Sequence, residues 1–270
     1  MKGRVLICAG SDSGGGAGIQ ADIKAVTAMG AYAATAITAL TAQNTQGVFG
    51  VFGVAPDFIR QQMTLVLDDI GADAIKTGML ADVPTIEAVA DVLDARAGGL
   101  PVVVDPVMVA QSGDSLLDSG AVETLMARLL PRARLLTPNV PEAEKLTGAR
   151  IADVAAMEAA AQDLRTRGAE AVLLKGGHMD GDTLIDVLVT ADGAERFENP
   201  RIDTKHTHGT GCTLASAIAA GLAQGLALRD AVVRARTYVL AAIRTAPGIG
   251  QGSGPLNHLA GVRPFALDDA

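Results

Sequence analysis

Short apolar runs alternate with longer segments of helical periodicity along most of the chain. The runs in "RVLICA" (4–9), "PVVVDPV" (101–107) and "EAVLLKGG" (170–177) are continuous, not alternating. Continuous runs are typical of parallel strands that are covered on both faces. Further strands are predicted at "TAITALTA" (35–42), "DAIKTGM" (73–79) and "RLLTPN" (134–139).

The segments between these runs place apolar residues at helical spacing. Ile59, Met63, Val66 and Ile70 fall on one helix face, and Asp57 is expected to cap the start of that helix. Other helices are predicted over 17–30, 86–93, 122–129, 211–225 and 229–245. Strands that alternate with helices predict an α/β fold, in which helices sandwich a mostly parallel central sheet.

One pair of strands breaks this alternation. "DTLIDVLVT" (182–190) and "ERFENPRI" (195–202) flank Asp192-Gly193, a sequence typical of a hairpin turn. We therefore expect a short antiparallel hairpin at one side of the sheet. Because no linker or repeat interrupts the pattern, residues 1–270 are predicted to form one domain.

Composition narrows the range of partners. Apolar residues make up 49% of the chain, aromatic residues 3%, and the formal net charge is −8. Few aromatic side chains and a negative charge argue against binding nucleic acid. The two cysteines form no disulfide framework or metal motif, and no apolar run reaches the roughly eighteen residues of a membrane span. A cytoplasmic protein with no membrane or nucleic-acid partner is expected.

The first candidate site lies in "AGSDSGGGAGIQAD" (9–22), a glycine-dense turn between a strand and a helix. Backbone N–H groups at such a turn bind anions or allow a ligand to approach closely. The stretch lacks the Gly-Lys-Ser/Thr of a phosphate-binding P-loop and the spacing of a dinucleotide-binding loop. Gln43 follows the second strand, and its amide suits the edge of an amino-substituted heterocycle. Capping of the local backbone is the alternative role for Gln43.

Two further stretches follow predicted strands. In "TPNVPEAEKL", Asn139 and Glu142 either cap a short helix or order the water shell of Mg²⁺. In "LLKGGH", Lys175 follows a buried strand and is placed to reach a phosphate group. His178 is expected to be structural.

The stretch "KHTHGTGCTLAS" (205–216) places a cysteine at the start of a helix. The N–H groups of Gly209, Thr210 and Gly211 would stabilise developing negative charge there. A thiol in the first turn is expected to have a lowered pKa. Cys212 is therefore a candidate base that takes a proton from a hydroxyl group.

Taken together, "AGSDSGGGAGIQAD", "TAQNTQGV", "KTGML", "VVVDPVM", "LLTPNVPEAEKL", "LLKGGH" and "THGTGCTLASAIAA" resemble the hydroxymethylpyrimidine/phosphomethylpyrimidine kinases of thiamine biosynthesis. Those enzymes belong to the ribokinase-like superfamily. The resemblance implies phosphoryl transfer from ATP, with Mg²⁺, to 4-amino-5-hydroxymethyl-2-methylpyrimidine, and a second transfer that converts the monophosphate to the diphosphate. It also implies a homodimer.

The same resemblance assigns roles to particular residues. It implies that Cys212 is catalytic beside an anion hole, and that Glu142 acts on the metal through water. It places Gln43, Gly10, Asp22 and Met79 in the pyrimidine pocket, and Lys175, Asp105, Asn139 and Thr207 near ATP or its phosphates.

Two departures and two alternatives accompany this resemblance. Ser13-Gly14 stands where many relatives carry Ser or Pro-Ser, so that three glycines follow Ser13 in a row. Arg236 stands where a Lys near the nucleotide is common. A pyridoxal or pyridoxine kinase is the nearest alternative, because part of that activity shares the fold and the GTGC-type motif. A NAD(P)-hydrate dehydratase is a more distant one.

Overall fold

The computed structural model describes residues 1–108, 120–179 and 181–263. Its strands form a nine-stranded sheet in the order β3-β2-β1-β4-β5-β6-β7-β8-β9. The strands are β1 (Arg4–Asp12), β2 (Tyr32–Asn44), β3 (Gly47–Gly53), β4 (Ala74–Thr77), β5 (Val102–Val104), β6 (Ala133–Leu136), β7 (Val172–Leu174), β8 (Thr183–Thr190) and β9 (Gly193–Pro200).

The centre of the sheet is parallel and both of its sides are antiparallel. Strands β2, β1, β4, β5, β6 and β7 pair in parallel, whereas β8 and β9 form the predicted hairpin beside β7. At the other side β3 pairs antiparallel with β2, and this strand was not predicted. Its sequence, "GVFGVFG", contains three glycines, which weaken the strand signal.

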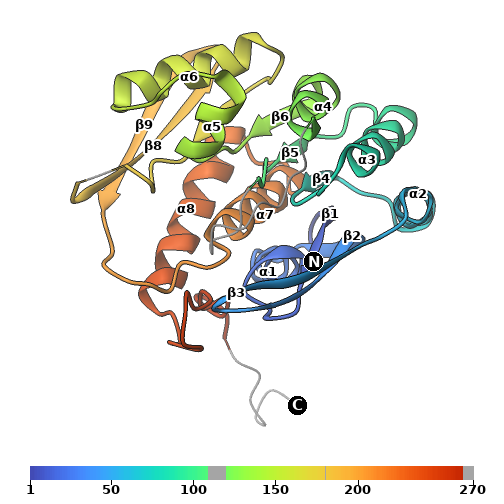
Figure 1. Cartoon of the computed structure of the whole chain (residues 1–270), viewed down its shortest axis with the longest axis horizontal. Coiled ribbons are helices and arrows are strands. Elements are labelled where there is room, and N and C mark those ends of the chain that lie inside the picture. Colours follow the sequence, from blue (N-terminus) through green and yellow to red (C-terminus); the bar gives the residue numbers. More distant parts are fainter. Residues whose placement is uncertain (109–119, 180, 264–270) are drawn as a thin grey trace.

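Helices cover both faces of the sheet (Figure 1). One layer contains α2 (Pro56–Leu65), α3 (Val83–Arg96), α4 (Ala121–Arg128), α5 (Val140–Thr147) and α6 (Val154–Thr166). The other contains α1 (Gly18–Ala28), α7 (Thr210–Ala223) and α8 (Leu228–Arg244). Each layer buries its own core against the sheet, so the expected sandwich is confirmed.

Successive side chains of a strand point to opposite faces of the sheet, and this alternation produces the two cores. Leu6 and Cys8 of β1 pack under the α2–α6 layer, whereas Val5 and Ile7 pack under α1, α7 and α8. Both sets are fully buried, which explains why the strand reads as a continuous apolar run. Helix α7 is buried along most of its length and lies against the sheet, with α8 outside it.

Local details differ from the sequence-based expectations in two places. Asp57 lies in the first turn of α2, but Ala55 is the N-cap residue and no side chain caps the helix. Pro56 occupies the first helical position, where its missing N–H costs nothing. Gln43 lies within β2 and not after it, because β2 continues into the hairpin with β3.

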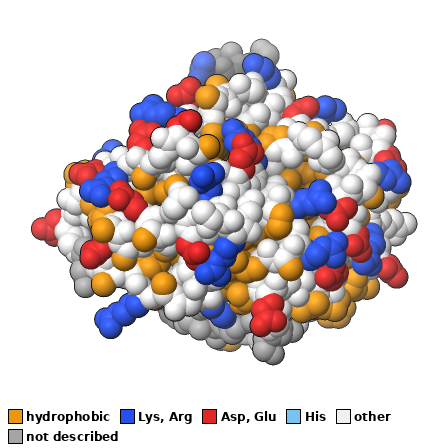
Figure 2. Space-filling view, turned by 90° about the horizontal axis from the view of Figure 1, so that it is seen from above, with side chains coloured by type: hydrophobic (Ala, Val, Ile, Leu, Met, Phe, Trp, Pro, Cys, Tyr) orange, Lys and Arg blue, Asp and Glu red, His pale blue; other side chains and the backbone are white. Residues whose placement is uncertain are grey.

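The surface carries both charge signs side by side. Figure 2 shows acidic and basic side chains interspersed on one face of the molecule. Arg128, for example, contacts Glu87, Asp91 and Asp94. Among the described residues, no helix has the length and apolar character needed to cross a bilayer.

Candidate active site

A cavity of about 450 Å³ lies at the carboxyl ends of the parallel strands. Asp12 ends β1, Asp105 follows β5, Asn139 follows β6 and Lys175 follows β7, and all four line this cavity. The N-terminus of α7 closes it from another side with Gly209, Thr210, Gly211 and Cys212. Ligands of open α/β sheets bind at this edge, so the strand order itself brings together side chains that are far apart in sequence.

Three of the residues predicted for a heterocycle pocket line this cavity. They are Gly10 of β1, Gln43 of β2 and Met79 after β4. A Cβ atom at position 10 would lie 3.2 Å from the sulfur of Met79, so glycine keeps this part of the cavity open. Three of the four residues predicted for the heterocycle pocket therefore do meet.

Asp22, the fourth, is placed differently. Its side chain is fully buried on α1 and is not among the residues that line the cavity. Both carboxylate oxygens accept hydrogen bonds from Lys76 Nζ at 2.9 Å, and Ser216 of α7 donates to Oδ1 at 2.7 Å. Lys76 does line the cavity, so Asp22 acts on the site through the ammonium group of Lys76.

The start of α7 is packed tightly against the first glycine-rich loop. Gly209, the N-cap residue, has φ +81°, and a Cβ there would lie 1.8 Å from the carbonyl oxygen of Gly16. Thr210 donates its N–H to the carbonyl of Thr207 at 3.2 Å. The N–H of Thr210 is therefore used within the turn. The next two N–H groups, those of Gly211 and Cys212, belong to the first helical turn, where no intrahelical acceptor exists.

The expectation of a lowered Cys212 pKa is wrong. Burial raises the pKa of the Cys212 thiol to about 12, although the Lys76 ammonium acts in the opposite direction. The negative charges of Asp22 and Asp105 raise it further. The positive end of a helix lowers the pKa of a thiol, but removal of the Cys212 sulfur from water raises it by more. Cys212 is therefore a thiol in the free protein.

Lys175 faces the same region from the other side. Its Nζ lies 3.1 Å from Asp105 Oδ1, and Asp105 also accepts a hydrogen bond from Thr137 at 3.1 Å. Burial lowers the pKa of Lys175, but the charges of Asp105 and Glu142 outweigh this effect and raise it overall. Lys175 is thus a partly buried ammonium group beside Gly211, where an added Cβ would lie 3.1 Å from Nζ.

Asn139 and Glu142 form a complete capping box at the start of α5. Asn139 Oδ1 accepts from the Glu142 N–H at 2.9 Å, and Glu142 Oε2 accepts from the Asn139 N–H at 2.8 Å. The capping alternative is therefore correct for the free protein. Burial raises the pKa of Glu142 to about 7, with Lys175 opposing the shift and Asp105 adding to it.

The same acidic residues suit a hydrated divalent cation. No group of three or more metal-ligating side chains occurs among the described residues. A Mg²⁺ ion, however, keeps several waters and binds mainly to substrate phosphates, so one or two carboxylates suffice. Glu142 lines the cavity with Asn139, so its carboxyl group is within the space that a hydrated ion and its phosphates would occupy.

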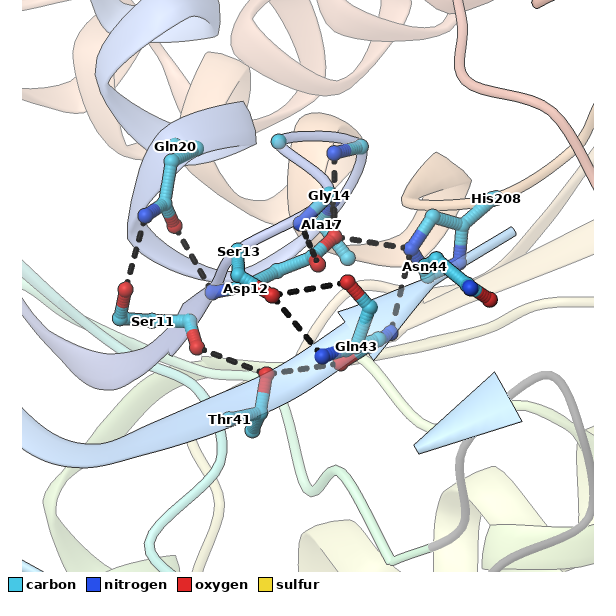
Figure 3. Close-up of polar contacts among 12 residues, drawn as sticks. Ser11, Asp12, Ser13, Gly14, Ala17, Gln20, Thr41, Gln43, Asn44 and His208 are labelled. Atoms are coloured by element: carbon cyan, nitrogen blue, oxygen red, sulfur yellow. Dashed lines mark hydrogen bonds and ion pairs between the residues drawn. The ribbon is translucent and has the colours of Figure 1, made fainter. Parts of the chain in front are cut away.

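The first loop is organised around Asp12 (Figure 3). The Asp12 carboxylate accepts from the N–H groups of Gly14, Gly16 and Ala17 at 2.8, 3.0 and 2.8 Å. His208 Nε2 lies 2.9 Å from Asp12 Oδ2 and 3.3 Å from Gln43 Nε2. Asp12 and His208 were not singled out from the sequence, because 196 residues separate them.

A family model described as phosphomethylpyrimidine kinase matches residues 12–257 of this chain. The chain belongs to the phosphomethylpyrimidine kinase family. The hydroxymethylpyrimidine/phosphomethylpyrimidine kinase of Streptomyces coelicolor is 46% identical over 94% of this chain and 93% of that protein.

A second relative is a longer protein than this chain. The thiamine biosynthesis bifunctional protein ThiED of Geobacter sulfurreducens is 54% identical over 96% of this chain. The match covers 52% of that protein, so this chain spans about half its length.

Solved structures of two kinds share the fold. A phosphomethylpyrimidine kinase from Clostridium difficile 630 has a TM-score of 0.80 and 40% identity, over 90% of this chain and 100% of that one. An ADP complex of Bacillus subtilis pyridoxal kinase has a TM-score of 0.89 and 37% identity, over 96% of this chain and 98% of that one. The predicted ribokinase-like α/β fold is confirmed.

The cavity lining also contains side chains that the sequence did not indicate. Leu184 of β8, Ile202, and Leu240 and Ile243 of α8 are its apolar members, and Arg201 is a polar one; His178, which was expected to be structural, lines the cavity as well. The apolar residues read as ordinary core positions of a strand and a helix. Their role depends on the position of the β8–β9 hairpin, which no local pattern gives.

Arg236 of this family member does not line the cavity. Its Nε donates to Asp186 of β8 at 2.8 Å, and its Nη2 donates both to the Phe197 carbonyl at 3.1 Å and to Asn199 Oδ1 at 2.8 Å. The guanidinium group also lies 5.1 Å from the centre of the Phe197 ring. Arg236 therefore links the hairpin to α8.

We expect Arg236→Ala to lower the free energy of unfolding by about 3 kcal/mol, because the buried Asp186 carboxylate loses its positively charged partner and keeps only the Gly176 N–H. Urea unfolding measures this loss. Arg229→Ala is the matched control, since Arg229 lies on the same helix and pairs with Glu195 of the same hairpin in an exposed position. The control should be nearly neutral, and equal losses would contradict the structural role of Arg236.

Proposed function

We propose that the protein transfers the γ-phosphoryl group of ATP to 4-amino-5-hydroxymethyl-2-methylpyrimidine and then phosphorylates the monophosphate to the diphosphate, as a step of thiamine biosynthesis. The observation that carries this proposal is the arrangement of one cavity. A ring-sized end at Gly10 and Met79 and a cationic end at Lys175 meet at Cys212 and the start of α7. Such a cavity would suit a heterocyclic alcohol placed against a phosphate donor.

Gln43 is proposed to bind the edge of the pyrimidine. A primary amide offers a donor and an acceptor side by side, which complements a ring nitrogen next to an exocyclic amino group. The hydroxymethyl group of a ring held there would point towards the start of α7, where Cys212 lines the cavity.

The phosphoryl group is proposed to lie between α7 and Lys175. The N–H groups of Gly211 and Cys212 would donate to its oxygens, and the partly buried ammonium group of Lys175 would balance their charge. Phosphoryl transfer depends mainly on such positioning and charge stabilisation. The apolar wall at Leu240 and Ile243 suits the base of the nucleotide.

Asn139 and Glu142 are proposed to hold the water shell of Mg²⁺ with Asp105 nearby. When bound, the ion would supply charge neutralisation and orientation for the donor phosphates. Glu142 would have to lose the proton that its raised pKa favours. Asn139 would keep the carboxylate of Glu142 in place through the capping box.

Cys212 is proposed to act as the base in the first transfer only. The hydroxymethyl group must lose a proton when it attacks, whereas the phosphate monoester of the second substrate is already largely ionised at pH 7, since its second pKa is about 6. A base with a high pKa is a strong proton acceptor, although few molecules carry the thiolate at neutral pH. The two acceptors therefore test the role of this residue within one enzyme.

We expect Cys212→Ala to slow the first phosphorylation by roughly 100-fold or more and the second by less than about tenfold, because general-base catalysis contributes only to the first. Rapid-quench assays with each acceptor measure both rates.

The proposed role of Cys212 as a base also determines how the rate of the first phosphorylation depends on pH. The active form is the thiolate, so the first rate should rise with pH towards the raised Cys212 pKa of about 12 and fall as the pH is lowered. Equal losses for both acceptors, or a first step whose pH profile is unchanged by Cys212→Ala, would remove Cys212 as the base.

A pyridoxal kinase activity is the second candidate, because one solved structure with this fold is a pyridoxal kinase. Pyridoxal also presents a hydroxymethyl group on an aromatic ring. It lacks a ring nitrogen next to an amino group, which is the feature that Gln43 is proposed to recognise.

Mass spectrometry of products from MgATP and equal amounts of the two heterocycles distinguishes these activities. We expect pyrimidine monophosphate first and diphosphate later, with pyridoxal consumed at least tenfold more slowly, since a missing hydrogen-bond partner leaves Gln43 unpaired. Pyridoxal phosphate with untouched pyrimidine would replace the proposed substrate and keep the phosphoryl chemistry.

We also propose a homodimer of single-domain chains that pairs through the β2–β3 side of the sheet. Phe49 and Phe52 of β3 are 72% and 71% exposed, and Val51 lies beside them on this edge strand. Exposed apolar edge strands are unusual in monomers because they promote association.

Light scattering should give about twice the 27.4 kDa of one chain. Phe49→Asp should reduce this towards one chain by placing a charge in the interface. A wild-type mass of a single chain would exclude the dimer.

A further inference from the structure

The segment that follows α8 has a glycine at every second position. It reads "GIGQGSGP" over residues 248–255. Glycine loses more conformational freedom on folding than any other residue, so such a run is unfavourable unless close contacts require it. Residues 250–255, here called the glycine strap, lie beside the β2–β3 hairpin (Figure 1).

One side of the glycine strap contacts the turn between β2 and β3. The N–H of Ser253 donates to the Thr45 carbonyl at 2.9 Å, and the N–H of Gly252 donates to Thr45 Oγ1 at 3.2 Å. The side-chain amide of Gln46 donates to Gln251 Oε1 at 3.0 Å. A Cβ at position 252 would lie 2.0 Å from the carbonyl oxygen of Thr45, so glycine is what allows this close approach.

The other side of the glycine strap contacts the segment that leads into α7. The Gly254 carbonyl accepts from the His208 N–H at 3.2 Å, and Pro255 forms a parallel β-bridge with His208. A Cβ at Gly254 would lie 2.3 Å from His206 Nδ1. His208 directly precedes Gly209, the N-cap residue of α7. The glycine strap therefore joins two segments that are far apart in the sequence.

These two segments carry different parts of the cavity. Gln43, two residues before Thr45, forms the heterocycle end with Gly10 and Met79, whereas Cys212 lies in the first turn of α7 at the phosphate end. Thr45 and the glycine strap do not line this cavity themselves. They can act on a substrate only through the residues that they hold in place.

The end of β2 is held at two points. On one side, the Ser13 hydroxyl accepts from the Gln43 N–H at 2.8 Å and donates to the Gln43 carbonyl at 2.7 Å (Figure 3). On the other side, the glycine strap binds Thr45 in the turn that follows. Displacement of either contact changes the angle at which the end of β2 approaches α7.

The distance between these parts matters for the reaction. A nucleophile attacks efficiently when the reacting atoms are held about 3–3.5 Å apart and aligned. We propose that the glycine strap is a positioning segment that sets the separation between the end of β2 and the start of α7, and so aligns the bound hydroxyl group with the phosphoryl group. This inference rests on the proposed phosphoryl transfer to a heterocyclic alcohol and adds the element that aligns the two substrates.

Gly252→Ala tests this role with one added methyl group. Gly252 lies outside the left-handed region, so alanine can adopt its backbone conformation. Carbon and oxygen atoms in contact stay about 3.3 Å apart, so the strap and the turn must separate by roughly 1 Å to admit a Cβ that would lie 2.0 Å from the Thr45 oxygen. Gly98→Ala is the matched control, because Gly98 also lies outside that region and its added Cβ has nothing within 4 Å.

Calorimetry with the pyrimidine and with MgADP, and rapid-quench assays of the first phosphorylation, measure the outcome. We expect Gly252→Ala to slow that step by roughly 100-fold, the effect of a misplacement of about 1 Å. Its Kd for the pyrimidine should rise about threefold or more, while its Kd for MgADP stays within about twofold of wild type. Gly98→Ala should remain within about twofold in all three measurements.

Other results overturn the inference. A wild-type rate in Gly252→Ala, or equal weakening of pyrimidine and MgADP binding, would mean that the glycine strap only supports the fold. Should Gly252→Ala not fold, two substitutions of Thr45 decide, because Thr45→Val removes the hydroxyl that accepts from Gly252 and Thr45→Ser keeps it. Slower transfer in Thr45→Val alone supports the proposal, and equal rates contradict it.

The failure of the proposed substrate has a different signature. A wild-type enzyme that phosphorylates only pyridoxal overturns the proposed pyrimidine activity, and the same variants assayed with pyridoxal then decide the role of the glycine strap. A wild-type enzyme that phosphorylates neither heterocycle overturns the proposed function and this inference together.

Discussion

The close approach of two backbone segments shapes the whole site. The start of α7 meets the first glycine-rich loop so tightly that a Cβ at Gly209 would lie 1.8 Å from the carbonyl oxygen of Gly16. This contact directs the N–H groups of α7 into the space beyond the ends of β1, β4, β5 and β7. It also encloses the His208 ring, so the heterocycle end and the phosphate end of the cavity share one rigid wall. A methyl group at either glycine would separate them.

The ammonium groups of Lys76 and Lys175 place positive charge beside this wall, and the two differ in their surroundings. Lys76 is bound to both oxygens of Asp22 and has no exposed surface, so it contributes a fixed field beneath Cys212. Lys175 has one contact with Asp105 at 3.1 Å and borders Gly211. Burial of a charge without a partner costs several kcal/mol, so each lysine is paired with a carboxylate. Under the proposed function, Lys175 would exchange part of that pairing for a phosphate.

The sequence predicted most of the elements and part of the cavity lining from local patterns, and the family resemblance added Gly10, Met79, Asp105 and Thr207. Continuous apolar runs identified the parallel strands, and residues directly after those strands, such as Lys175 and Asn139, had to meet at one edge of the sheet. The features that the sequence did not predict depend on how the elements pack together. Strand β3 was missed because its glycines weaken the pattern. The direction of the Cys212 pKa was wrong because burial of its sulfur outweighs the helix terminus, and Asp12 and His208 meet only through the fold.

The most direct test of the account is a crystal structure of the protein with the aminopyrimidine alcohol, Mg²⁺ and a non-hydrolysable ATP analogue. The account predicts the ring between Gly10 and Met79 with a ring nitrogen on the Gln43 amide. The hydroxymethyl oxygen should lie beside the sulfur of Cys212, and the terminal phosphate between Gly211 and Lys175. A ring bound instead against Leu240 and Ile243, or a terminal phosphate remote from α7, would contradict it.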